Sequence, residues 1–87
     1  MKIKNGFVVR EIAGQSVVVA LGEASKSFNG IIKLNETGRI IWDMLCEAAE
    51  KDQIVEKILS EYEIDRATVE KDVDGFVNIL KENNILE

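Results

Sequence analysis

The segment GIIKLNETGRIIW, residues 30–42, changes its hydrophobic period half-way along and thereby decides the fold. Residues 30–34 form a short apolar run interrupted by Lys33, which is typical of a strand. Asn35 is a good helix N-cap, and Glu36 in the first turn complements the helix dipole. Apolar residues then recur at helical spacing, so the segment predicts a short strand that leads directly into a helix.

Two β-branched runs precede this segment. Residues 7–12 (FVVREI) and 16–21 (SVVVAL) are separated by Ala13-Gly14-Gln15, whose glycine accommodates a positive φ. This arrangement predicts an antiparallel hairpin. A polar stretch, residues 22–29, connects the hairpin to a third strand over Gly30–Leu34.

Three amphipathic helices are expected after the strands. The first follows Asn35, the second covers about residues 52–61, and the third is capped by Asp65 and runs to about residue 82. Asn83 and Asn84 should end the third helix, because asparagine tolerates a left-handed conformation. The order β-β-β-α-α-α predicts a single α+β domain over residues 1–87, a winged-helix-like fold in which a three-stranded antiparallel sheet is followed by a three-helix bundle.

The composition provides little for catalysis. The 87 residues are 46% hydrophobic and 31% charged, and they include no histidine, which is the commonest general base and metal ligand. Cys46 is the only cysteine and has no base beside it, so we expect an inert thiol, no catalytic residue, no metal site and no cofactor. No apolar run is long enough for a membrane span, which favours a cytoplasmic protein without a membrane partner.

The charge is unevenly distributed along the chain. Residues 1–39 contain six basic and three acidic side chains, whereas residues 40–87 contain five basic and thirteen acidic ones. The third helix itself has more acidic than basic residues. This pattern argues against nucleic acid as a partner, since binding to the phosphate backbone depends on clustered cations.

Several features could form a binding site. The outer edge of Gly30–Leu34 could pair with a guest strand or, alternatively, be a protected edge. Gly75 in the third helix indicates either close approach of a partner or close packing within the protein. Trp42 lies one position off the buried stripe of its helix, so we expect it at the edge of the core rather than as an anchor for a partner. Three cations near the third strand could form one wall of a groove, opposite the acidic third helix: Lys26, Lys33 and Arg39.

Three groups of residues together resemble a known family. The most specific is LNETGRIIW (34–42), and the others have helical spacing: Ile54, Val55, Leu59, Tyr62, then Asp72, Val73, Phe76, Val77 and Leu80. This pattern is similar to the PqqD family, the coenzyme-PQQ-synthesis-D-type proteins, and to the related recognition elements of ribosomally synthesised, modified peptides. The similarity extends from Phe7 to Leu86.

The resemblance implies a non-catalytic adaptor. Such a domain binds the leader segment of a precursor peptide as a strand beside its third strand, in a cleft against the third helix. It presents the peptide to a maturation enzyme, often a radical S-adenosylmethionine enzyme. The expected peptide-binding residues are Gly30, Ile31, Ile32, Lys33, Leu34, Asp72, Val73, Phe76 and Ile79. The alternatives are a winged-helix DNA-binding domain and a structural module that forms a homodimer through the free strand edge.

Overall fold

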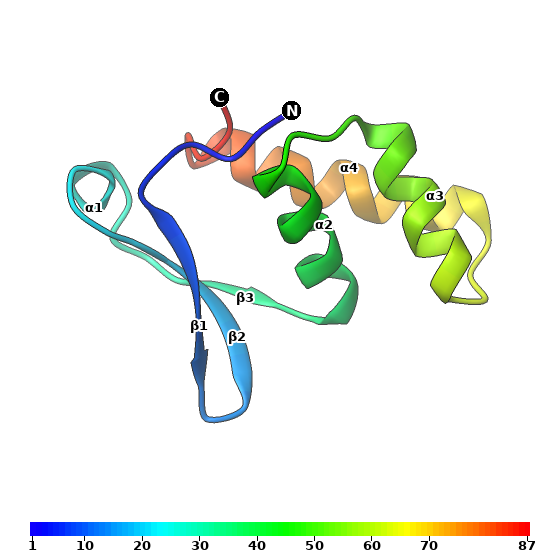
Figure 1. Cartoon of the computed structure of the whole chain (residues 1–87), viewed down its shortest axis with the longest axis horizontal. Coiled ribbons are helices and arrows are strands. Elements are labelled where there is room, and N and C mark those ends of the chain that lie inside the picture. The colour runs from blue at the N-terminus through cyan, green and yellow to red at the C-terminus, as the bar shows by residue number, and fades with distance from the viewer.

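The computed structural model describes all 87 residues and confirms the α+β fold (Figure 1). A three-stranded antiparallel sheet lies to one side of the longer helices. The elements are β1 (Phe7–Ile12), β2 (Gln15–Ala20), α1 (Ala24–Ser27), β3 (Ile32–Leu34), α2 (Glu36–Cys46), α3 (Lys51–Glu61) and α4 (Arg66–Glu82). No helix has the length and apolar composition needed to span a membrane.

The sheet has the strand order β1-β2-β3. The hairpin between β1 and β2 turns through Ala13 and Gly14, which both have positive φ, 51° and 78°. Two successive positive φ values suit the right-handed twist of a hairpin, and Gly14 adopts this conformation without strain. The third strand pairs only with β2, with Ile32 opposite Val18. β3 therefore forms one edge of the sheet.

Two elements differ from the sequence-based expectation. The polar stretch of residues 22–29 contains the one-turn helix α1, in which the Ser25 hydroxyl donates to the carbonyl oxygen of Gly22 at 2.6 Å. The third strand is shorter than predicted, because Gly30 and Ile31 lie outside the sheet ladder. The apolar composition of residues 30–34 does not show which of them pair with β2, and the ladder covers only Ile32–Leu34.

The caps of the long helices are as predicted. The side chain of Asn35 accepts a hydrogen bond from the Gly38 amide at 2.8 Å, and Asp65 accepts one from the Thr68 amide at 3.2 Å. At the far end of α4, Asn84 adopts a left-handed conformation with a φ of 59°. The chain then folds back, and Ile85 and Leu86 are buried.

The core is wider than one stripe per helix. Trp42 is only 2% exposed, so its predicted position at the edge of the core is wrong. The reason is that the two chain termini, which lie close together in Figure 1, add another wall. Ile3 forms a β-bridge with Leu86, and both side chains join Trp42 in a single apolar cluster with Ile85. This packing ties the two termini to α2 and α4.

Candidate functional site

The outer edge of β3 carries no neighbouring strand. Peptide groups along such an edge alternate in direction, so every second amide and carbonyl points away from β2. These groups can bind water or a guest strand. The edge continues into residues 30 and 31, where Ile31 is 61% exposed. The structure thus provides the open edge on which a strand-addition site depends.

A cavity of about 400 Å³ lies between the first turns of α2 and the outer flank of α4. It begins at Asn35, which directly follows β3. Three residues of the predicted site line it: Asp72, Phe76 and Ile79. The other edge strand, β1, contributes nothing to this cavity. The open edge of β3 and the cavity are therefore close along the chain.

The helical period of α4 explains which of its residues line the cavity. Positions 72, 75, 76 and 79 are separated by three or four residues and fall on one flank. The adjoining stripe of Val69, Val73, Val77 and Leu80 is buried in the core. Ile79 is a large apolar side chain that remains 46% exposed at this cavity. Exposed apolar surface in a concave site is typical of a binding surface.

Gly75 also lines the cavity. A Cβ atom built at this position would meet no atom within 4 Å, so close packing inside the protein does not account for this glycine. Gly38, on the opposite wall, is different. A Cβ there would lie 3.0 Å from the Asn35 Oδ1 and 3.5 Å from the Phe76 ring. The glycine in α2 leaves room for the side chain of Asn35, which caps the same helix, whereas the glycine in α4 borders open space.

The remaining predicted residues fall into two groups. Leu34 and Val73 are buried in the core, and Val73 is 0% exposed, so these two support the site from beneath. Gly30, Ile31 and Lys33 are exposed along the edge, and Ile32 is half-buried against the core. None of residues 30–34 lines the cavity itself. Their contribution to binding stays a prediction.

The charges around the groove differ from the expected arrangement. Arg39 is held by Asp43 at 3.1 Å and also lies 3.7 Å from Glu11, while Lys26 pairs with Glu23. Lys33 is the one cation of the predicted set without an ion pair or a side-chain hydrogen bond. Asp72 and Lys71 at the cavity are likewise unpaired. The charged groups free to contact a guest are thus one lysine at the edge and this adjacent pair on α4.

Five cavity residues do not belong to the predicted peptide-binding set. They are Asn35, Thr37, Gly38, Ile41 and Lys71. The first three belong to the segment of residues 35–38, which the sequence also offers as a possible functional feature, although a helix start is its simplest interpretation. That segment forms the start of the helix and one wall of the cavity at once. The available signal was that this segment belongs to the most specific part of the family resemblance, which marks it as more than a helix start.

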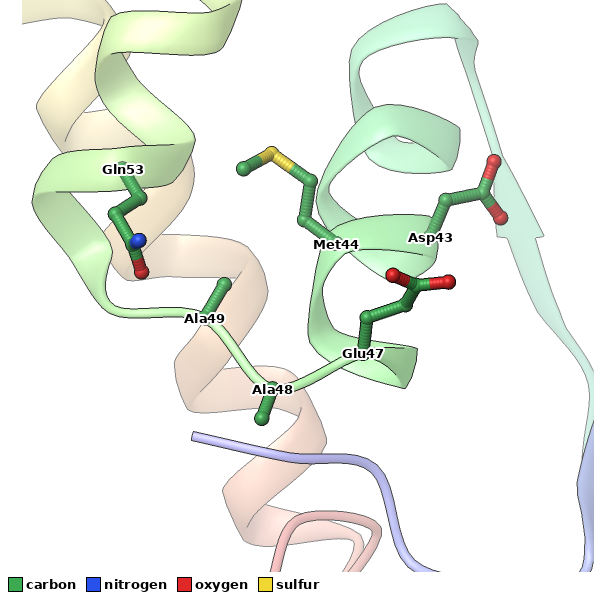
Figure 2. A pocket seen from close by; sticks show the side chains of 6 residues that line it. All are labelled: Asp43, Met44, Glu47, Ala48, Ala49 and Gln53. Carbon is green, nitrogen blue, oxygen red and sulfur yellow. The ribbon is translucent and has the colours of Figure 1, made fainter.

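A second depression, of about 410 Å³, lies where α2 ends and α3 begins. Figure 2 shows the Asp43 and Glu47 carboxylates on α2, and Met44 and Gln53 extending into the space between the helices. It contains none of the predicted residues. Cys46 is exposed at this end of α2. Partial desolvation, followed by the Asp43 carboxylate, raises the pKa of the Cys46 thiol, which disfavours the reactive thiolate at neutral pH.

Comparison with known proteins places the fold in a family. The profile of the family described as Coenzyme PQQ synthesis protein D (PqqD) matches residues 9–86. The chain belongs to the PqqD family. No curated protein sequence matches the chain significantly.

Two solved structures resemble this PqqD-family chain over nearly its whole length. One is TbiB1 in complex with the TbiA(beta) leader peptide, with 32% sequence identity and a TM-score of 0.78, covering 100% of this chain and 95% of that one. The other is lasso peptide synthetase B1 complexed with the leader peptide, with 24% identity and a TM-score of 0.75, covering 97% and 93%. The second likeness supports the fold alone.

Proposed function

We propose that this chain, acting as a single peptide-recognition domain over residues 1–87, is a non-catalytic adaptor that binds the leader segment of a ribosomally synthesised precursor peptide. The leader adds as a strand to the open edge of β3. Its apolar side chains enter the cavity between α2 and α4. The observation that carries the proposal is this open edge beside an apolar cavity. The leader peptide bound to TbiB1, a protein 32% identical to this chain, supports it.

The energetics require both parts of the site. A dissociation constant of 1 μM corresponds to about −8 kcal/mol. Each hydrogen bond between backbones contributes about 1 kcal/mol net, and the short β3 edge can form only a few of them. The rest must come from apolar burial at roughly 25 cal/mol per Å². Ile79 and Phe76 provide the apolar surface for this burial.

The adaptor role also requires a second partner. A chain that binds a leader without modifying it serves to bring the precursor to a maturation enzyme, of which a radical S-adenosylmethionine enzyme is one class. The same edge could pair with a second copy when no peptide is present, because an unpaired strand edge is self-complementary. Leader binding would then dissociate this homodimer.

The direct test is a titration with the leader peptide of the precursor that this protein serves. We expect a one-to-one complex with a dissociation constant in the micromolar range or below by calorimetry. A scrambled leader of identical composition should bind at least about tenfold more weakly, because strand addition fixes register. Duplex DNA at low salt is the second comparison, since α4 has five acidic and three basic residues when its cap is included. Equal binding of both peptides, or salt-sensitive DNA binding instead, would contradict the proposal.

Gly75 gives a prediction in which stability and binding change in opposite directions. Replacing Gly75 by methionine should raise the free energy of unfolding by about 0.5–1 kcal/mol, because glycine is a poor helix former. The same side chain should occupy the cavity and weaken leader binding about tenfold, the equivalent of 1.4 kcal/mol. Urea denaturation and calorimetry measure the two effects.

Gly75→Ala is the matched control for this experiment. It should provide a similar gain in stability while adding only one methyl group to the cavity. If Gly75→Met binds the leader as tightly as the wild type, the leader side chains do not use this cavity.

A further inference from the structure

The face of the sheet turned away from the core combines apolar and basic side chains. Strand residues alternate between faces, and directly paired residues share a face. Val9, Val18 and Ile32 lie on the core face and pack in the main cluster. The opposite face, which we call the outer sheet face, consists of Val8, Arg10, Ile12, Gln15, Val17, Val19 and Lys33.

Val17 at the centre of the outer sheet face is buried without the help of the core. It is 5% exposed, yet it does not belong to the core cluster. Its direct cross-strand partners are Arg10 on β1 and Lys33 on β3. The aliphatic stems of these side chains can cover the valine while their charged ends remain in water. Two cations therefore flank an apolar centre.

The apolar surface extends along the strands. Val8 and Val19 form the next cross-strand pair; both are half-buried, and neither packs against the core cluster. Ile12, at the end of β1, is 53% exposed. Val17 itself is covered, so the accessible apolar surface of this face is that of Val8, Val19 and Ile12. Apolar surface bordered by charges is typical of protein–protein interfaces. This face thus has the composition of a docking surface for another protein.

The charge of the outer sheet face is opposite to that of the whole chain. It contains no carboxylate, and neither Arg10 nor Lys33 forms an ion pair within the chain. Glu11 lies on the other face, where it accepts a hydrogen bond from the Ser16 hydroxyl at 2.7 Å. The chain as a whole has a net charge of −5, because the thirteen acidic and five basic side chains of residues 40–87 outweigh the basic excess of residues 1–39. An acidic partner is attracted to this face and repelled by the helices, which orients the encounter.

We infer that the outer sheet face is the docking surface for the maturation enzyme, through an apolar patch on that enzyme rimmed by carboxylates. This inference rests on the proposed function. Lys33 belongs both to the outer sheet face and to the edge that receives the leader. A leader strand beside β3 would extend the same face, so an enzyme docked there would contact adaptor and leader together. A symmetric contact between two copies would oppose like charges, which disfavours a second copy as the occupant.

The test uses a double variant on β1, the strand farthest from the leader edge. Arg10→Glu combined with Ile12→Glu reverses one charge and removes one exposed apolar side chain. The probe is the purified maturation enzyme that acts on the same precursor peptide, titrated with the leader-bound adaptor. We expect its affinity to fall at least about 20-fold, while leader affinity stays within about twofold. Lys81→Glu, an exposed charge reversal on α4, should leave enzyme binding unchanged.

The outcomes separate this inference from the function on which it rests. If the wild-type protein does not bind the leader, the proposed function is contradicted. Normal leader binding with no enzyme binding, or with equal enzyme affinity in the wild type and the double variant, would overturn only the docking surface. Vesicles of equal parts phosphatidylglycerol and phosphatidylcholine are the last comparison. If the double variant loses vesicle binding but keeps enzyme affinity, an anionic lipid surface occupies this face and the inference is wrong.

Discussion

Replacing Ile79 by glutamate is expected to weaken leader binding at least about 100-fold, the equivalent of 2.8 kcal/mol. Burial of an isoleucine side chain contributes about 1.5–3 kcal/mol, and a carboxylate in the same apolar contact adds a desolvation penalty. Ile79 is suited to this experiment because it lines the cavity and remains half exposed. The substitution should therefore leave the fold intact, as circular dichroism and thermal unfolding would show.

Asn78 provides the matched control. It is the neighbouring exposed residue of α4 and does not line the cavity. Asn78→Glu introduces the same charge about 100° around the helix, so leader affinity should change by less than about threefold. Phe76 is a poorer choice, since it packs against the core and close to Gly38. Equal affinity in the Ile79 and Asn78 variants would place the apolar contact elsewhere.

N-methylation of the leader on alternate residues should weaken binding strongly when the methylated amides face β3, and only slightly when they point away from it. In an added strand, every second amide points at the host edge and the others point away. Methylating two or three amides that face β3 removes about 1 kcal/mol for each hydrogen bond and adds steric clash, so affinity should fall about 100-fold. Methylating the alternate set should change affinity by less than about fivefold. Fluorescence anisotropy with labelled leaders measures both series.

The two alternate sets of methylated amides control for each other, because both peptides have the same length, composition and number of methyl groups. Leader binding through a helix would be disrupted by either set. Binding through side chains alone would be indifferent to both. Only strand addition predicts an effect with a period of two.

Local pattern was enough to predict most of the fold. The Asn35 and Asp65 caps, the hairpin and the left-handed Asn84 depend on residues a few positions apart, and each was predicted correctly. The features that were missed depend on distant contacts. Trp42 is buried in the cluster that the two termini complete, and β3 is short because only residues 32–34 pair with β2. Neither contact leaves a signal in the local sequence.

The candidate site was predicted only in part, because one of its walls follows from a local pattern and the other from contacts between distant residues. Helical spacing predicted that Asp72, Gly75, Ile79 and Glu82 share one flank of α4 and that Phe76 belongs to the buried stripe. The structure places Asp72, Gly75, Phe76 and Ile79 at the cavity, and Glu82 does not line it. The opposite wall comes from the first turns of α2. Its position follows from the packing of Gly38 against the Phe76 ring, which no pattern within either helix specifies. The family resemblance supplied the link between β3 and α4 that periodicity could not.

Amide hydrogen exchange along residues 31–34, measured by NMR with and without the leader peptide, tests strand addition most directly. In the free protein, the amides that point away from β2 should exchange rapidly, because no backbone acceptor covers them. Saturation with the leader should protect these outward amides and leave the already paired ones largely unchanged. Unaltered exchange at all four positions in a saturated complex would show that the peptide binds somewhere other than the β3 edge.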